Sequence, residues 1–277
     1  MMNVLVLGAS GLIGSSIFKY LSSKKNLFVI GTYNSNKPHF SNIINFNFLK
    51  NDISFFSKYN LIINCIGITK HNKAASDINL IYQLNIKLPL LLDDCAKKKI
   101  FNVIHISTDC VFDGLNGNYK ENAFDFSIDN YGQTKRIAER IMKNSLVIRT
   151  STIGHELFYN NGLLEWFLST KKKCIGFDNA YFNGLTTLEL AKVINKYFIK
   201  KSYFPRSLIN VGSFKISKFD LLCEIKKAYK KNVEIERDFN FKLDRTMNIN
   251  KFINLTEYRP KTWYKMIQEN KDFLNNV

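Results

Sequence analysis

Several features are scarce or missing in this sequence, and each absence excludes a class of protein. No run reaches the roughly 18 apolar residues that a membrane helix needs. The five cysteines form no Cys-x-x-Cys pair, which argues against a disulfide framework or a zinc site. The start of the chain leads into the short apolar run 4–7 and lacks the charged and longer apolar regions of a signal peptide. We therefore expect no membrane span, no metal and a cytoplasmic location.

Negative charge is also in short supply, because the net charge is +17 over 277 residues. A basic chain of this kind can bind nucleic acid. The lysines, however, gather at 97–99, 171–173, 200–201 and 230–231, each at the end of an expected helix, where cations complement the helix dipole and stay solvated. We therefore expect no nucleic-acid partner, but an attraction for an anionic small ligand.

What is present begins with a strand, a glycine turn and a helix. The apolar run 4–7 precedes the turn, and apolar residues at helical spacing follow it. In this context three glycines permit a tight turn, close approach of the backbone to a pyrophosphate and close helix packing, with phosphates at the positive helix N-terminus. The residues expected to bind a dinucleotide here are Gly8, Ser10, Gly11, Leu12, Ile13 and Gly14.

The second strand is expected at 27–32. At its end a cofactor with a free ribose 2′-hydroxyl usually meets an Asp or Glu. Tyr33, Asn34, Ser35 and Lys37 stand there instead. Neutral hydrogen-bonding groups and a cation suit a 2′-phosphate, so we expect NADPH as the cofactor, with NADH possible. The alternative is a polar turn without a role.

Two further stretches are expected to approach the cofactor. A short run at 46–49 predicts the third strand. The continuous apolar run 61–67 is typical of a parallel strand buried on both faces, and it contains Cys65, Ile66 and Gly67, where a glycine lets the backbone approach a ligand.

A helix is expected around 80–98. It carries Asn85 among apolar neighbours, and this amide can be either a satisfied core group or a site residue.

The fifth strand, at 101–107, is expected to deliver polar residues to the edge at which open α/β sheets bind ligands. These residues are Ser107, Thr108, Asp109 and Cys110. The alternative for Ser-Thr-Asp after a strand is ordinary turn or cap chemistry. His105 lies within the strand among apolar residues and is interpreted as a packed core histidine.

Tyr131 and Lys135 lie at the start of an expected helix, four residues apart. Such residues are neighbours on one face, and an ammonium beside a phenol favours the phenolate, which lowers the phenol pKa. We therefore expect Tyr131 to exchange a proton near neutral pH. The same spacing recurs at Tyr20, Tyr33 and Tyr197, so it gains meaning only from the glycine turn and the Ser-Thr-Asp strand upstream.

Strands and helices alternate through the rest of the chain. The remaining expected elements are a strand at 146–151, helices at 162–173 and from 186 to near Lys201, a strand at 208–211, a helix at 217–230, and a closing helix from Trp263 to Leu274. This order predicts an α/β fold with a doubly wound parallel sheet and a smaller C-terminal substrate lobe. The expected division is a dinucleotide-binding domain of 1–152 plus 180–213 and a lobe of 153–179 plus 214–277.

The motifs together resemble the extended short-chain dehydrogenases, specifically the dTDP-4-dehydrorhamnose reductase group. The resemblance rests on the glycine turn 8–14 and the stretches 107–114, 131–135 and 147–151. It implies that Thr108, Tyr131 and Lys135 form a catalytic trio and that Lys135 also holds the nicotinamide ribose. It further implies that NAD(P)H reduces a keto carbon of a nucleotide-linked sugar in surface polysaccharide synthesis, by a monomer or homodimer.

The substrate side departs from that family at two positions. Cys110 stands where the family usually has a tyrosine, and Thr152 where a tryptophan is common. The smaller Cys110 leaves room for a bulkier substituent, such as an acetamido group at C2. Arg245 is the candidate for gripping the substrate pyrophosphate, because a guanidinium makes bidentate bonds to phosphate. The expected substrate contacts are therefore Ser107, Thr108, Asp109, Cys110 and Arg245.

Three alternatives share this fold. A nucleotide-sugar 4,6-dehydratase usually carries an Asp-Glu pair after the threonine, whereas this chain has Asp109 and Cys110. An epimerase would retain its cofactor tightly. The non-enzymatic alternative resembles the NADP-binding regulatory subunit of methionine adenosyltransferase.

Overall fold

The computed structural model describes residues 1–69, 73–200 and 204–273. Its centre is a sheet of seven strands in which every neighbouring pair is parallel. In spatial order the strands are β10 (Leu208–Asn210), β6 (Leu146–Thr150), β5 (Asn102–Thr108), β4 (Leu61–Asn64), β1 (Met2–Leu7), β2 (Leu27–Tyr33) and β3 (Ile43–Asn45). The order reverses at β1, as in a doubly wound sheet. The prediction of this fold is confirmed.

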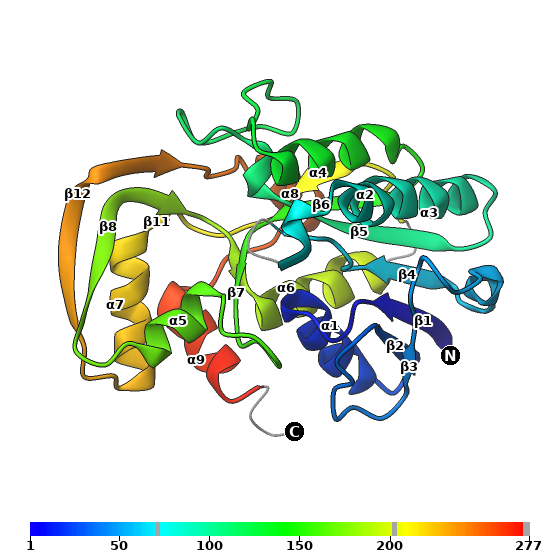
Figure 1. Ribbon diagram of the computed structural model, residues 1–277, viewed down its shortest axis with the longest axis horizontal. Helices are drawn as coiled ribbons and strands as arrows, with labels where there is room; N and C mark the ends of the chain where they lie inside the picture. Colours follow the sequence, from blue (N-terminus) through cyan, green and yellow to red (C-terminus); the bar gives the residue numbers. More distant parts are fainter. Residues whose placement is uncertain (70–72, 201–203, 274–277) are drawn as a thin grey trace.

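Helices cover both faces of the sheet (Figure 1). One face carries α1 (Leu12–Ser22) and α6 (Thr187–Val193), which continues as the π-helix η5 (Ile194–Ile199). The other face carries α2 (Ile78–Tyr82), the π-helix η3 (Gln83–Lys87), α3 (Leu88–Lys97) and α4 (Asn130–Ile141). Short 3₁₀ turns are η1 (Ser54–Lys58), η2 (Lys73–Ser76) and η4 (Asp109–Val111).

The strand β1 is buried on both sides, which explains its continuous apolar run. Val4 and Val6 enter the core shared with α1 and α6, whereas Leu5 and Leu7 enter the core shared with α3. All four side chains are inaccessible to solvent. Alternate residues of one strand therefore fasten both helical layers to the sheet.

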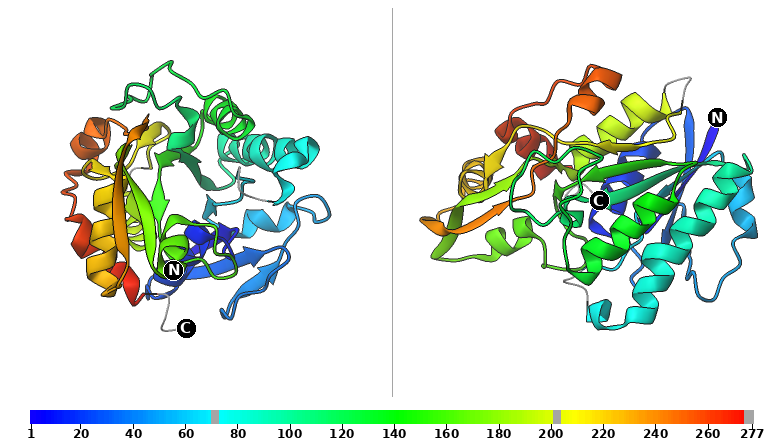
Figure 2. Two further views of the ribbon diagram at one scale, coloured as in Figure 1. Left: turned by 60° about the vertical axis from the view of Figure 1, so that its left-hand side comes forward. Right: turned by 90° about the horizontal axis from the view of Figure 1, so that it is seen from above.

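Most of the remaining elements form a lobe at one end of the molecule, whereas α8 (Asn250–Thr256) packs against β10 of the central sheet. The sheet of the lobe has the order β11 (Ile216–Ser217), β8 (Lys173–Phe182) and β12 (Glu234–Asp244). Figure 2 shows β8 and β12 side by side, with α7 (Lys218–Tyr229) packed against them. The other elements are α5 (Leu163–Ser169), α9 (Trp263–Lys271) and the paired strands β7 (Thr152–Ile153) and β9 (Leu185–Thr186).

The structure corrects two expected elements and adds two long strands. The third strand is Ile43–Asn45 rather than 46–49, and Phe46 instead packs in the core. The helix expected at 162–173 ends at Ser169, so the lysines 171–173 do not close a helix, and Lys173 opens β8. The long strands β8 and β12 were not expected at all. Charged and partly exposed residues in both strands hide the strand pattern.

Other expectations are confirmed. Thr186 and Ser217 cap α6 and α7 by accepting hydrogen bonds from backbone N–H groups three residues ahead. The expected helix ends at Lys201 and Leu274 lie outside the described residues. Within the described part of the chain, no helix is both long and apolar enough to cross a bilayer. The division into 1–152 plus 180–213 and 153–179 plus 214–277 stays a prediction.

Candidate active site

The glycine turn between β1 and α1 is tightly folded. Gly8 has a φ of 78°, and its N–H donates to the Thr32 hydroxyl at 3.0 Å. A Cβ added at Gly14 would lie 2.1 Å from the Gly8 carbonyl oxygen, so only glycine fits there. Gly11 starts α1 without a side-chain cap, and the first turn has no acidic residue. The backbone N–H groups at this helix start are therefore not claimed by a side chain or opposed by a negative charge.

The residues around this turn have different exposures. Gly11 is exposed, and Ser10, Leu12 and Ile13 are half-buried. At the end of β2, Asn34, Ser35 and Lys37 are exposed and Tyr33 is half-buried. The Asn34 side-chain oxygen accepts a hydrogen bond from Asn47 Nδ2 at 3.0 Å, which fixes this amide. Ser35 and Lys37 therefore remain the exposed polar side chains at this position.

The residues after β4 connect the glycine turn to Lys135. A Cβ added at Gly8 would lie 3.2 Å from Ile66 Cγ1 and 3.3 Å from the Cys65 carbonyl carbon. A Cβ added at Gly67 would lie 3.9 Å from Lys135 Nζ. The structure thus brings the turn, the segment 65–67 and Lys135 to one edge of the sheet.

Asn85, in the π-helical turn η3, holds the segment that follows Gly67. Its Oδ1 accepts from the Ile68 N–H at 2.8 Å, and its Nδ2 donates to the Ile68 carbonyl at 3.1 Å and to Thr134 Oγ1 at 3.2 Å. It is fully buried. Of the two interpretations of Asn85, the satisfied core amide is the observed one, and its bonds position the backbone beside Lys135.

Tyr131 lies in the first turn of α4. Asp129 caps this helix by accepting from the Gly132 N–H at 2.7 Å. A Cβ at Gly132 would lie 2.3 Å from the Cys110 carbonyl oxygen, so the glycine lets the helix approach the loop after β5. This approach brings Tyr131 close to Thr108, whose hydroxyl accepts from the Cys110 N–H at 3.1 Å and donates to Asp109 Oδ1 at 3.3 Å.

The expectation that Lys135 lowers the Tyr131 pKa is wrong for this structure. Burial raises the pKa of Tyr131 above its ordinary value, Cys110 and Asp109 act in the same direction, and Thr108 opposes them. The Lys135 amine is instead turned to His105 Nε2, at 3.0 Å, and to the Ile106 carbonyl, at 2.7 Å. Tyr131 therefore keeps its proton at neutral pH, which is the form that a general acid needs.

Lys135 is itself unusual, since it is 4% exposed. Burial lowers its pKa to about 8, while Glu139 and Cys65 act in the opposite direction. His105 is buried, as expected for a core histidine, but its contact with Lys135 was missed. Nothing in the local sequence of β5 indicates this contact, because it depends on how α4 packs on the sheet.

Ser107 faces an interior ion pair. Its hydroxyl donates to Glu139 Oε1 at 2.5 Å, and the Glu139 carboxylate binds Arg149 at 3.0 and 2.6 Å. Arg149 also donates to Asn210 and lies over the Phe112 ring, 4.6 Å from its centroid. The Ser107 hydroxyl is therefore engaged by this interior pair and does not face a substrate site.

The lobe contributes two cations beside the loop after β5. Arg245 Nη1 lies 3.5 Å from Cys110 Sγ, and Arg245 Nε is buried without a hydrogen-bond partner among the described residues. Lys218, at the start of α7, was missed by the sequence analysis. Burial lowers its pKa, and Asp109 and Cys110 oppose this shift, which places Lys218 within their electrostatic reach. Its only sequence signal is its position next to the helix cap Ser217.

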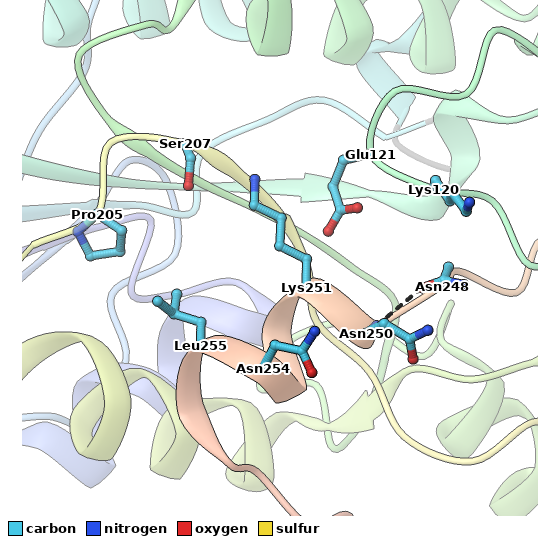
Figure 3. Close-up of a pocket in the computed structure, with 9 residues that line it drawn as sticks. All are labelled: Lys120, Glu121, Pro205, Ser207, Asn248, Asn250, Lys251, Asn254 and Leu255. Atoms are coloured by element: carbon cyan, nitrogen blue, oxygen red, sulfur yellow. Dashed lines mark hydrogen bonds between the residues drawn. The ribbon is translucent and has the colours of Figure 1, made fainter.

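A hollow of about 740 Å³ lies elsewhere, along the outer edge of β10 (Figure 3). Its walls include Glu121, which accepts from the Asn210 N–H at 3.1 Å, and Lys251, which donates to the Leu208 carbonyl at 2.7 Å. None of the predicted site residues lines it. These two side chains satisfy backbone groups at the edge of β10, and the hollow does not belong to the candidate site. Among the described residues, no group of three or more His, Cys, Asp or Glu side chains could hold a metal ion.

The sequence is similar to those of several curated proteins. A dTDP-4-dehydrorhamnose reductase of Aggregatibacter actinomycetemcomitans is 31% identical over 180 residues, covering 62% of this chain and 58% of the relative. Methionine adenosyltransferase 2 subunit beta of Bos taurus is 29% identical over 153 residues, covering 52% of this chain and 43% of the relative. The chain thus spans about half the length of the curated relatives that it matches.

Solved structures share the fold over the whole chain. A hypothetical dTDP-4-dehydrorhamnose reductase from Sulfolobus tokodaii has a TM-score of 0.78 at 24% identity, covering 95% of this chain and 98% of that one. A dTDP-4-dehydrorhamnose reductase from Bacillus anthracis, in complex with NADP, has a TM-score of 0.78 at 18% identity, covering 99% and 100%. The family described as RmlD substrate binding domain matches residues 2–173, more than half of the sequence, and the chain belongs to this family.

Proposed function

We propose that the protein is an NADPH-dependent reductase of a nucleotide-activated 4-keto-6-deoxysugar. The proposal rests on the residues that gather at one edge of the sheet. The glycine turn contacts the segment 65–67, Gly67 of that segment lies beside Lys135, and Lys135 shares α4 with Tyr131. Tyr131 in turn lies close to Thr108. A dinucleotide site next to a proton-bearing phenol fits the reduction of a carbonyl group.

The glycine turn fits a cofactor that contains a pyrophosphate. The turn is so tight that a Cβ at Gly14 would collide with the Gly8 carbonyl, and the helix that starts at Gly11 has neither side-chain cap nor acid in its first turn. Such a helix start binds phosphate through backbone N–H groups. We assign Gly8, Ser10, Gly11, Leu12, Ile13 and Gly14 to the pyrophosphate, and Cys65, Ile66 and Gly67 to the neighbouring wall.

The end of β2 supports NADPH over NADH. Ser35 and Lys37 are exposed there, and no acidic residue occupies positions 32–37 to meet a free 2′-hydroxyl. A lysine and a hydroxyl can both bind a 2′-phosphate. Tyr33 and Asn34 complete the turn, and NADH remains possible as the weaker ligand.

When bound, NADPH supplies a hydride to the keto carbon of the sugar. Tyr131 donates its proton to the carbonyl oxygen as negative charge develops on it, and the Thr108 hydroxyl binds the same oxygen. Lys135, held by the Ile106 carbonyl and His105, has one remaining direction in which to donate a hydrogen bond to a cofactor ribose hydroxyl. These roles are those that the family resemblance implies for the trio.

The lobe supports an anionic, nucleotide-linked substrate. Arg245 and Lys218 place two cations near Asp109 and Cys110. The buried Arg245 Nε has no partner among the described residues, so it can donate to a phosphate oxygen. Cys110 is small, and we propose that it leaves room for a 2-acetamido group on the sugar.

A second candidate is a non-enzymatic, NADP-binding regulatory subunit, because the relatives include subunit beta of methionine adenosyltransferase 2. An epimerase of the same fold would purify with bound cofactor. The dehydratase is disfavoured, because Cys110 cannot replace the glutamate that this reaction uses.

The decisive experiment follows NADPH oxidation with nucleotide 4-keto-6-deoxyhexoses, with and without a 2-acetamido group, and identifies the product. We expect a 4-hydroxy sugar. NADPH binding without turnover of any sugar would favour the regulatory subunit, whereas turnover of only the plain sugar would refute the role of Cys110. The cytoplasmic location, the role in polysaccharide synthesis and the monomeric or homodimeric state belong to the same proposal.

A further inference from the structure

Three buried polar side chains form a continuous hydrogen-bonded chain behind the candidate site. Asn64, at the end of β4, places Nδ2 3.0 Å from His105 Nδ1 on β5. The other ring nitrogen, His105 Nε2, lies 3.0 Å from Lys135 Nζ on α4. Asn64 and His105 are completely inaccessible to solvent, and Lys135 is 4% exposed. Asn64 and His105 have no part in the chemistry assigned to Tyr131 and Thr108.

The backbone fixes the direction of this chain. The Ile66 N–H donates to Asn64 Oδ1 at 3.0 Å, so the carboxamide must present its NH₂ group to His105. His105 Nδ1 is then an acceptor and carries no proton. Burial lowers the His105 pKa well below its ordinary value, and Lys135 acts in the same direction, so the ring is neutral and its one proton is on Nε2.

At the other end, His105 Nε2–H points at Lys135 Nζ. An amine can accept this hydrogen bond with its lone pair and still donate to the Ile106 carbonyl, 2.7 Å away. An ammonium has no lone pair and would set N–H against N–H. Moving the ring proton to Nδ1 would set it against the Asn64 NH₂ group, and rotating that amide would leave the Ile66 N–H without an acceptor. When Lys135 is protonated, each of these three arrangements thus leaves one buried N–H group without an acceptor.

The other ionisable groups around Lys135 offset this effect only in part, because Glu139 raises the Lys135 pKa but leaves it below its ordinary value. Glu139, on α4, is engaged by Arg149 at 2.6 Å and by Ser107. Burial raises the pKa of Cys65 to about 12, so this thiol is uncharged at neutral pH. Tyr131 also keeps its proton. None of the ion pairs formed between described residues includes Lys135.

We propose that Asn64 and His105 are positioning residues that bias Lys135 toward its uncharged amine form by fixing the direction of the hydrogen bonds around Nζ. Lys135 would then take up and release a proton near neutral pH instead of carrying a permanent charge. This deepens the proposed reductase function and rests on it only for its catalytic consequence. The protonation pattern itself is a property of the protein alone.

The first test reads the His105 tautomer by ¹⁵N NMR in otherwise unmodified protein at about pH 9.5, above the Lys135 pKa of about 8, where the amine form predominates. The chain has four histidines, and single His→Gln variants of His39, His71 and His155 assign the other three signals. We expect an unprotonated Nδ1 and a protonated Nε2. A proton on Nδ1, or an imidazolium, would overturn the proposal whether or not any sugar is reduced.

The second test reverses the direction of the chain. In Asn64→Asp, the carboxylate accepts from both the Ile66 N–H and His105 Nδ1–H, so His105 Nε2 becomes an acceptor for an ammonium. We expect the tautomer to switch and the Lys135 Nζ titration, followed in ¹⁵N-lysine-labelled protein and assigned with Lys135→Met, to move at least about tenfold in proton concentration toward high pH.

The matched control is Asn85→Asp. Asn85 Oδ1 and Lys135 Nζ lie 3.3 and 3.9 Å from the same point, the Cβ position of Gly67, but Asn85 makes no bond to His105. The new carboxylate should therefore act on Lys135 by charge alone and leave the His105 tautomer unchanged. A switch in both variants, or in neither, would contradict the proposal. Should either variant fail to fold, the tautomer of the unmodified network decides the matter.

Discussion

The two halves of the candidate site are built from different parts of the chain. In the cofactor half, the glycine turn presents backbone N–H groups. It leaves no room for a side chain at Gly14, where an added Cβ would lie 2.1 Å from the Gly8 carbonyl oxygen. In the proton half, β5 and α4 bury Lys135 and His105, and Tyr131 is half-buried beside them. Backbone groups carry no net charge, so placing them at the site costs little free energy. Burying ionisable side chains costs more, because the charged form is removed from water. The cofactor half should therefore contribute to function and stability together, and the proton half should contribute to function at the expense of stability.

The largest expected effect is on turnover, from Tyr131→Phe. Loss of a general acid typically costs about 10²- to 10⁴-fold in rate, so kcat should fall by that order while NADPH affinity stays nearly unchanged. Steady-state kinetics and cofactor titration would measure both. Near-normal turnover would remove Tyr131 from the mechanism and favour the regulatory-subunit alternative.

In the cofactor half, Gly14→Ala should damage both properties. Its Cβ has no room beside the Gly8 carbonyl, and overpacking of this kind costs about 1–3 kcal/mol in the free energy of unfolding. NADPH affinity should fall with it. Gly162→Ala is the matched control, since its nearest contact would be an ordinary 3.5 Å to Glu156. Chemical denaturation that found the two variants equally stable would contradict this account of the turn.

In the proton half, Lys135→Met should lose activity but gain stability. The Lys135 pKa is lowered from 10.5 to about 8, so between these values the unfolded chain binds more protons than the native protein. The unfolding free energy of the unmodified protein should therefore rise with pH across this window, by at most about 3 kcal/mol. Below pH 8 the penalty is present in full, and the variant should be more stable there by about 1–3 kcal/mol.

Denaturation curves at pH 7 and pH 10 would check this difference. The exposed Lys98→Met serves as the control and should change stability by less than about 0.5 kcal/mol. A Lys135→Met protein that is less stable than the parent at pH 7 would show that the bonds to Ile106 and His105 outweigh the cost of burial.

The smallest effect is expected at the exposed rim of the cofactor half. Lys37→Ala removes one solvated cation, and exposed ion pairs contribute about 0.2–1 kcal/mol, so the preference for NADPH over NADH should fall only a few-fold. Titration with both cofactors at two salt concentrations would measure the change. An unchanged preference would assign the discrimination to Ser35 and the backbone.

Sequence patterns predicted those parts of the fold that are locally encoded. Apolar runs marked β1, β2, β4, β5 and β6, because parallel strands buried on both faces read as continuous apolar stretches. The lobe was harder, because β12 is mostly exposed and is held by its pairing with β8, a contact between segments about sixty residues apart. The third strand was predicted at 46–49 because that segment is apolar, whereas the strand that pairs with β2 is Ile43–Asn45.

The candidate site divides in the same way. The glycine turn and the Tyr131–Lys135 spacing are local signals, and the structure brings them to one edge of the sheet. The pairing of Lys135 with His105 and the approach of Lys218 to Asp109 depend on packing between distant segments, which spacing along the chain does not encode. The Tyr131 pKa was misjudged for the same reason, since burial outweighed the expected help from Lys135.

The side chains that border the hollow beside β10 have a consequence for self-association. An open edge strand normally invites another chain to continue the sheet. Here Glu121 and Lys251 already occupy the Asn210 N–H and the Leu208 carbonyl. A second copy could extend the seven-stranded sheet at β10 only by displacing a carboxylate and an ammonium together. Glu121 and Lys251 therefore protect this edge of the sheet against pairing with the strand of another molecule.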